Sequence, residues 1–183
     1  MFLTAKLCLA QMGGLNGKRI LDIGCGTGTL AAMVKQMYPD ADVVGLDGDP
    51  QILEIARSKA KNQGVAIHFE QGMSFDLPYP NASFDIVLTS FMLHHLNRAD
   101  KQKTAREMYR VLRPGGRLFG VDFTEPRNIY GRTIMSLARP FERIADNLDG
   151  FLPIMFREAD FKNYQETRHY LSGTISLFQS STN

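Results

Sequence analysis

The sequence is poor in cysteine, in long apolar runs and in net charge. Its 183 residues include two cysteines, Cys8 and Cys25, which do not suggest a disulfide framework. No stretch approaches the roughly 18 apolar residues of a transmembrane helix. Residues 1–12 are too short and too weakly basic for a convincing signal peptide. These absences predict a cytoplasmic location.

A formal net charge of +2 is too small to indicate nucleic-acid binding. The sequence also lacks the phosphate-binding G-K-[ST] motif and any His/Cys spacing typical of a metal site. Hydrophobic residues make up 44% of the chain and charged residues 22%, which is typical of a globular protein. A chain of this length suits one sizeable core, so residues 1–183 are predicted to form a single domain.

The stretch KRILDIGCGTGTL, residues 18–30, is the main motif of the chain. Its apolar residues Ile20, Leu21 and Ile23 indicate a buried strand. Glycines at every second position and then a helical pattern follow this strand; they are Gly24, Gly26 and Gly28. A strand that ends in a glycine-rich turn at a helix N-terminus makes room for a ligand in α/β folds.

Two carboxylates define the kind of ligand that this turn would accept. Asp22 precedes the first glycine, where it would repel a pyrophosphate but attract an ammonium or sulfonium group. Asp47 ends the second predicted strand, where a carboxylate can accept hydrogen bonds from both hydroxyls of a ribose. Thr29 occupies the third glycine position of the dinucleotide pattern, which disfavours a nucleotide-dependent oxidoreductase. Adenosine with an amino-acid sulfonium tail satisfies these features.

Hydrophobic patterning divides the chain into alternating strands and helices. Five strands separated by connections of crossover length predict a doubly wound α/β fold, with a parallel sheet and helices on both faces. Two further strands, joined at Ser172-Gly173, are predicted to form an antiparallel pair at one edge. The predicted strands span residues 20–23, 41–46, 65–70, 84–90, 117–123, 164–170 and 174–179, and the predicted helices span 2–12, 30–38, 50–63, 98–112, 129–144 and 151–159.

Four motifs, in this order, resemble those of class I S-adenosylmethionine-dependent methyltransferases. They cover about residues 17 to 123, and four motifs together are far more specific than one. The motifs are LDIGCGTG (Leu21–Gly28), VVGLDGDP (Val43–Pro50), LPYPNASFDIVLTSFMLHHL (Leu77–Leu96) and YRVLRPGGRLFGVDF (Tyr109–Phe123). The chain looks like the subgroup that contains ubiquinone and menaquinone C-methyltransferases and many small-molecule methyltransferases. The resemblance implies a Rossmann-like seven-stranded sheet of order 3-2-1-4-5-7-6, with strand 7 antiparallel.

The resemblance also implies S-adenosyl-L-methionine as the cofactor and assigns roles to individual residues. Asp22 would orient the methionyl ammonium group, directly or through water. Asp47 would hold the ribose hydroxyls, and Gly48 would pass beside the adenine. The other implied cofactor contacts are the methionyl-tail residues Gly24, Cys25 and Gly26, the last glycine of the turn, Gly28, and the backbone around Thr89 and Ser90, which would cap the methionyl amino group.

One position departs from the family pattern. After the third strand the family usually has Gly-Asp-Ala, whose aspartate accepts a hydrogen bond from the adenine amino group. This chain has Gly72-Met73-Ser74 instead. Met73 can still pack on the adenine face, and adenine recognition would then rest on backbone groups or on Ser74. We expect weaker or differently placed adenine binding rather than its loss.

Methyl transfer from a sulfonium depends mainly on alignment of the nucleophile, the methyl carbon and the sulfur atom. A general base is required only if the nucleophile arrives protonated. His94 and His95, just beyond the fourth strand, are the candidates for this base; the alternative is that they are scaffold residues that pack or cap the next helix. Asp122, at the end of the fifth strand, has a similar pair of interpretations, as an acceptor contact or as a structural cap.

In this family the acceptor pocket is built by the N-terminal helix, here residues 1–16, and by the segment after the fifth strand, here residues 124–160. Basic residues beside apolar ones can bind an anionic membrane or an acidic substrate, whereas the alternative is a lid helix with solvated arginines. We expect a small or amphipathic acceptor, such as a quinone precursor or a phospholipid head group, with peripheral membrane contact left open. A protein that binds S-adenosylmethionine or S-adenosylhomocysteine without catalysis is the alternative function. The residues concerned are Arg127, Arg132, Arg139 and Arg143, with Phe2, Leu3 and Leu7 at the entrance.

Overall fold

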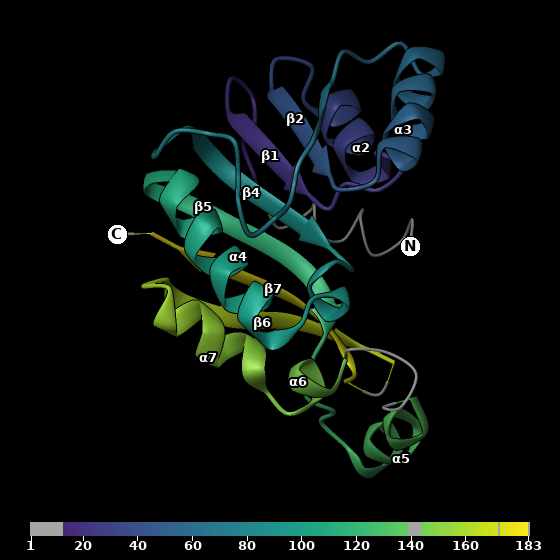
Figure 1. The fold of residues 1–183 in the computed structure, drawn as a ribbon, viewed down its shortest axis with the longest axis vertical. Helices are drawn as coiled ribbons and strands as arrows, with labels where there is room; N and C mark the ends of the chain where they lie inside the picture. The colour runs from purple at the N-terminus through teal and green to yellow at the C-terminus, as the bar shows by residue number, and fades with distance from the viewer. Residues whose placement is uncertain (1–12, 139–143, 172, 183) are drawn as a thin grey trace.

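The computed structural model describes residues 13–138, 144–171 and 173–182 (Figure 1). They contain a seven-stranded sheet of order β3-β2-β1-β4-β5-β7-β6. Strands β1 to β5 pair in parallel, and β7 is antiparallel to both of its neighbours. The sheet order and the antiparallel β7 confirm the predicted fold. The strands are β1 Arg19–Ile23, β2 Asp42–Asp47, β3 His68–Gln71, β4 Phe84–Ser90, β5 Leu112–Phe123, β6 Lys162–Tyr170 and β7 Ile175–Ser181.

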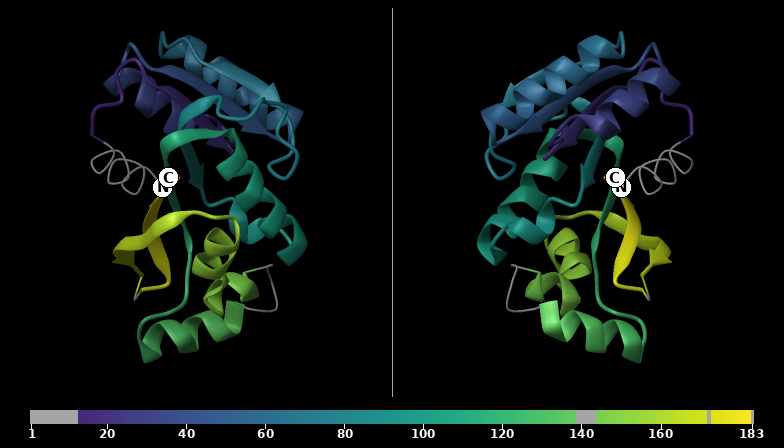
Figure 2. Two further views of the ribbon diagram at one scale, coloured as in Figure 1. Left: turned by 90° about the vertical axis from the view of Figure 1, so that its left-hand side faces the viewer. Right: turned by 90° about the vertical axis from the view of Figure 1, so that its right-hand side faces the viewer.

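Helices cover both faces of the sheet (Figures 1 and 2). α2 (Thr29–Met37) and α3 (Pro50–Asn62) share one hydrophobic cluster with Ile20 of β1. α4 (Arg98–Val111) and α7 (Phe151–Glu158) share the opposite cluster with Leu21. Because neighbouring strand residues point to opposite faces, a strand buried on both faces has a continuous apolar sequence, as in β1 and β4. The remaining helices are η1 Leu93–His95, α5 Ile129–Ala138 and α6 Ala145–Leu148.

Two sequence features fix the residues at which α3 and α2 begin. Asp49 caps α3, because its Oδ1 accepts the backbone N–H of Gln51 at 2.8 Å and that of Ile52 at 3.4 Å, while Pro50 occupies the first turn. Gly28 begins α2 with a φ of +69°, a conformation that glycine adopts without steric cost. Both helices therefore start directly after a strand that ends at the same edge of the sheet.

Two strands begin more than two residues away from the predicted positions. β5 begins at Leu112 rather than Arg117, because Leu112 pairs with Phe84 before a register shift and the main ladder resumes at Arg117. β3 spans His68–Gln71 rather than 65–70, since only these four residues pair with β2. α5 begins at Ile129, as predicted, and residues 139–143 of the predicted helix lie outside the described part of the chain.

Several predictions concern residues outside the described part of the chain. They are the helix over residues 2–12, the entrance residues Phe2, Leu3 and Leu7, and the arginines Arg139 and Arg143. Among the residues that the structure does describe, no helix is both long and apolar enough to span a membrane.

Candidate functional site

An open cleft of about 700 Å³ lies at the carboxyl ends of the parallel strands. This is the edge at which α/β sheets bind ligands, where strand order reverses between β1 and β4. The turn after β1, the end of β2, the loop after β3 and the segment after β4 all contribute to its walls. The predicted site residues that line it are Asp22, Gly24, Cys25, Gly26, Asp47, Gly48, Met73, Ser74, Ser90, His94 and His95.

Asp22 is a buried carboxylate facing this cleft. Asp22 is 1% exposed, and neither of its carboxylate oxygens has a hydrogen-bond partner. Burial raises the pKa of Asp22 to about 7, and the nearby negative charge of Asp47 raises it further. The backbone amide of Ala31 lowers the pKa of Asp22, although it does not reach hydrogen-bond geometry. An unpaired buried carboxylate is costly. A cationic ligand group in the cleft would supply the partner that the protein does not.

Asp47 is held in place by backbone donors on both sides. Its Oδ2 accepts the Gly26 N–H at 2.8 Å, and its Oδ1 accepts the Asp49 N–H at 3.1 Å. An ionised carboxylate has about four lone-pair sites, so both oxygens retain acceptor capacity toward the cleft. Asp47 therefore links the turn after β1 to the start of α3 and presents a pre-oriented pair of acceptors.

The glycines of the turn have different surroundings. Gly24 has a φ of +68°, and a Cβ built on it would lie 2.3 Å from Met92 Cγ, so only glycine allows Met92 to pack against this backbone. Gly28 faces away from the cleft, since its Cβ would lie 2.8 Å from Phe69 Cζ and 3.1 Å from the Ala56 side chain. Gly28 thus allows α2 to pack closely against its neighbours and does not line the cleft.

Thr89 is the second predicted residue that does not reach the cleft wall. Its side chain is 1% exposed, and its Oγ1 has no hydrogen-bond partner. Its Cγ2 packs beside Gly120 of the neighbouring strand, 2.9 Å from the position that a Gly120 Cβ would take. Ser90, the next residue of β4, points the other way and lines the cleft.

Met73 and Ser74, which stand where the family usually has Asp-Ala, have different surroundings. Met73 is 53% exposed, and its Sδ lies 3.2 Å from the position of a Cβ on Gly48. The Ser74 hydroxyl is hydrogen-bonded to the Thr104 hydroxyl at 3.0 Å in a buried position on α4. Met73 therefore covers the backbone at Gly48, while the hydroxyl of Ser74 is engaged away from it.

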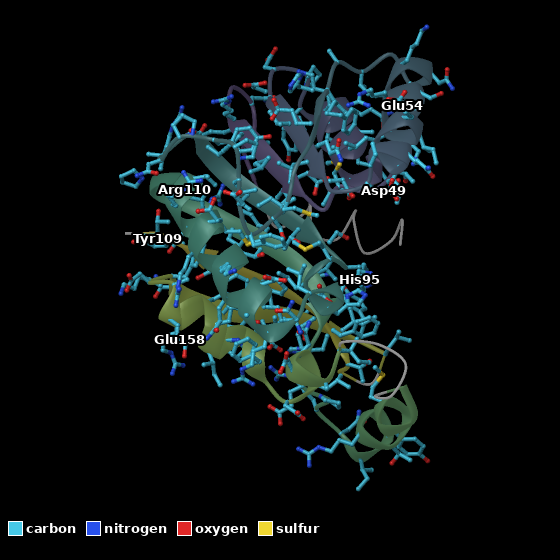
Figure 3. All side chains as sticks on the ribbon, in the orientation of Figure 1. Asp49, Glu54, His95, Tyr109, Arg110 and Glu158 are labelled. Carbon is cyan, nitrogen blue, oxygen red and sulfur yellow. The ribbon has the colours of Figure 1, made fainter. Side chains whose placement is uncertain are left out.

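The two histidines differ in burial and in partners. The His94 side chain is 6% exposed, with its Nδ1 2.7 Å from Asp122 Oδ1. The His95 ring is 4.0 Å from the His94 ring between centroids and is exposed beyond the end of β4 (Figure 3). Asp122 also accepts the backbone N–H of Leu93 at 2.9 Å, at the start of η1. Asp122 is thus both a cap for η1 and a partner of His94.

The sequence reasoning missed the apolar part of the wall. Their apolar character alone is equally typical of core residues. What they share is a place at or after the last residue of a parallel strand, in the loop that follows it or in the first turn of the next helix. They include Leu30, Ile52, Phe75, Phe91, Met92, Leu96 and Phe123. Among the described residues, no three His, Cys, Asp or Glu side chains gather as metal ligands would.

Comparison with protein families gives a match to a methyltransferase domain over residues 20–116. A demethylmenaquinone methyltransferase from Thermus thermophilus is 46% identical over 109 residues, covering 60% of this chain and 49% of the relative. A ubiquinone/menaquinone biosynthesis C-methyltransferase from Vibrio campbellii is 38% identical over 188 aligned positions, covering 89% of this chain and 71% of the relative. The chain spans about half the length, 49% and 44%, of the demethylmenaquinone methyltransferases that it matches.

Similar folds occur among solved structures. The YcgJ protein of Bacillus subtilis superimposes with a TM-score of 0.81 at 22% identity, covering 100% of this chain and 99% of that protein. The [4+2]-cyclase SpnF superimposes with a TM-score of 0.77 at 19% identity, covering 98% of this chain and 80% of that protein. At these identities the likeness concerns the fold alone, and SpnF is named for a different reaction, a [4+2] cyclisation.

Proposed function

Because this chain belongs to the class I S-adenosylmethionine-dependent methyltransferase family, we propose that it transfers the methyl group of S-adenosyl-L-methionine to a small-molecule acceptor. The observation that carries the proposal is the pair of carboxylates at the cleft. Asp22 is buried and unpartnered where a cationic group would lie, and Asp47 is held by two backbone amides where ribose hydroxyls would lie. No phosphate group is needed to explain either.

The cofactor would lie along the cleft from Asp22 to Met73. In this placement Asp22 binds the methionyl ammonium group, and the turn of Gly24, Cys25 and Gly26 contacts the methionyl tail. The ribose hydroxyls bind Asp47. The adenine then lies beside Gly48 and Met73, the thioether of which packs on its face. Ser90 lines the same cleft, and the methionyl amino group would lie beside its backbone.

The acceptor would enter beside the apolar wall made by Phe91, Phe123 and the segment after β4. The Phe91 and Phe123 rings are 6.0 Å apart between centroids in an edge-to-face arrangement, which suits a flat, apolar molecule. The relatives from Thermus and Vibrio carry names that refer to demethylmenaquinone and ubiquinone/menaquinone. These two observations support an acceptor of the quinone-precursor class. His94 and His95 lie at this end of the cleft.

We also propose a cytoplasmic protein whose α5 contacts a membrane surface that holds such an acceptor. Ile129 and Tyr130 are 77% and 76% exposed at the start of α5. Arg127 pairs with Glu166 at 3.3 Å, and Arg132 pairs with Glu125 at 3.7 Å. Each of these two arginines is therefore paired with a carboxylate, and the exposed apolar side chains are what support this contact.

Titration calorimetry with S-adenosylmethionine, S-adenosylhomocysteine and NAD tests the cofactor. Both sulfur ligands should bind at tens of micromolar or tighter, and NAD should not bind. Asp47→Ala should abolish binding, whereas Asp40→Ala, at an exposed turn outside the cleft, should leave it unchanged. Absence of binding by either sulfur ligand would refute the proposal.

A labelled-methyl assay with reduced demethylmenaquinone, followed by a screen of lipid extract and small metabolites, tests the transfer. Label should move to an organic-soluble product. Tight binding of S-adenosylmethionine without any transfer would instead indicate a binding protein.

A further inference from the structure

We infer that Thr29, supported by Lys59, forms a carboxylate-binding subsite of the cleft, so that the protein selects ligands whose tail is an intact α-amino acid. This inference rests on the proposed function and deepens it. Asp22, whose carboxylate has no partner, accounts only for the ammonium end of such a tail. The groups that would hold the carboxylate end lie at the start of α2 and on the face of α3 that packs against it.

Lys59 reaches the start of α2 because α2 and α3 lie side by side (Figure 1). The two helices come together at Gly28, where a Cβ would lie 3.1 Å from the Ala56 side chain. Lys59 follows Ala56 by three residues and therefore lies on the same face of α3. Its Nζ donates to Thr27 Oγ1 and to Thr29 Oγ1, each at 2.8 Å, since an ammonium group has three donors and no acceptor.

Positive charge gathers at this end of α2. A helix N-terminus carries roughly half a positive charge and leaves its first N–H groups without helical partners. α2 has no acidic residue in its first turn, and Gly28 gives it no side-chain cap. Within the part of the chain that the structure describes, the Lys59 ammonium group bonds to hydroxyls rather than to a carboxylate. A cation at the positive end of a helix is unfavourable by itself, so an anionic ligand group here would stabilise both.

Asp22 is an independent sign that a ligand binds at this place. Its carboxylate is buried, lines the cleft and has no hydrogen-bond partner. The backbone amide of Ala31 lowers the pKa of Asp22, so the carboxylate faces the first turn of α2. Asp22 and Lys59 thus approach the same helical turn, one as a negative group and the other as a positive group. An α-amino acid is complementary to this arrangement, since its ammonium and carboxylate groups are bonded to the same carbon atom.

Thr29 connects Lys59 to the cleft, because it is one of the residues that line the cleft wall. The Thr29 hydroxyl oxygen accepts from Lys59, which leaves its O–H available as a donor. The hydroxyl oxygens of Thr29 and Thr27 are 3.3 Å apart, which is longer than the roughly 2.5–3.0 Å of a good O–H···O bond, so this contact does not commit the proton. A cation bonded to the hydroxyl oxygen strengthens its donation. Thr29 would therefore bind the carboxylate, and Lys59 is a positioning residue that acts through it.

Titration calorimetry with S-adenosylmethionine and with its decarboxylated form tests the inference, because the decarboxylated ligand keeps both the sulfonium and the ammonium group. The unaltered protein should bind S-adenosylmethionine at least about tenfold more tightly than the decarboxylated ligand. Thr29→Val should remove most of this preference. Lys59→Met should lower it about threefold at low salt and by less at high salt. Thr29→Ser and Lys59→Arg, which keep the hydroxyl and the charge, should retain it.

The ratio of the two affinities separates carboxylate binding from a structural role, because a disturbed cleft would weaken both ligands alike and leave the ratio unchanged. Lys61→Met, at an exposed position of α3, is the matched control and should keep the ratio of the unaltered protein. Equal affinity of the unaltered protein for both ligands, or an unchanged ratio in either Thr29→Val or Lys59→Met, would overturn this inference alone. Absence of S-adenosylmethionine binding by the unaltered protein would overturn the proposed function and this inference with it. If Thr29→Val does not fold, Lys59→Met decides.

Discussion

Replacing Asp22 by asparagine should remove the part of the pH dependence of the free energy of unfolding that comes from the ionisation of Asp22. The side chain keeps its shape but loses its charge. In the native state burial raises the pKa of Asp22 from 3.8 to about 7. Between these values the native state holds a proton that the unfolded chain has released, so the free energy of unfolding falls as the pH rises through the window.

The magnitude follows from the pKa difference. Each unit corresponds to about 1.4 kcal/mol, so Asp22 should lower the free energy of unfolding by about 2.5 kcal/mol between about pH 5 and pH 8. Asp22→Asn removes this slope, although its buried amide leaves an unpaired polar group that costs about 1–3 kcal/mol at every pH. The change with pH is therefore the diagnostic quantity, and the absolute stability is not.

Urea denaturation at pH 5 and pH 8 checks the expectation. The stability of Asp22→Asn relative to the unaltered protein should rise by about 2.5 kcal/mol between the two pH values. The control Asp40→Asn, at an exposed turn, should show no such change. Equal pH dependence in Asp22→Asn and the unaltered protein would refute the reasoning, because the burial of an unpaired carboxylate is its only premise.

The same group should make cofactor binding depend on pH. An ammonium group binds the ionised carboxylate, so affinity for S-adenosylmethionine should rise from pH 6 to pH 8. Binding at pH 7 should release up to about half a proton. Calorimetry in two buffers of different ionisation enthalpy measures this release. Asp22→Asn should bind weakly and without it.

Three further predictions concern the cleft and its support. Met73→Asp should tighten S-adenosylmethionine binding severalfold in calorimetry by adding an acceptor for the adenine amino group; equal affinity in Met73→Asp and Met73→Ala would contradict this adenine placement. Gly24→Ala should be less stable than Gly26→Ala by about 1–3 kcal/mol in thermal unfolding, because both have positive φ but only the Gly24 methyl would overlap Met92. Arg110→Met should increase proteolysis of the loop over residues 72–82, because Arg110 binds the carbonyls of Leu77 and Tyr79; unchanged cleavage would show that the loop is held by other contacts.

Much of the architecture was readable from local pattern. The apolar run of β1, the cap of Asp49 on α3 and the turn glycines each depend on neighbours within a few residues, so sequence periodicity shows them. Boundaries were less accurate where pairing decides them. Leu112 joins β5 only because Phe84 lies opposite it, and no residue beside Leu112 in the sequence encodes that partner.

The sequence by itself determined the turn after β1, the carboxylates Asp22 and Asp47, and, through the resemblance, the order of the sheet. Only the tertiary structure decided which side chains meet. Gly28 belongs to the glycine-rich motif, but it faces Phe69 rather than the cleft. The direction of the folded backbone at Gly28 decides which side chains surround it, and the motif does not. His94 is 28 residues from Asp122 in the sequence, and the parallel pairing of β4 with β5 brings its Nδ1 to 2.7 Å from Asp122 Oδ1.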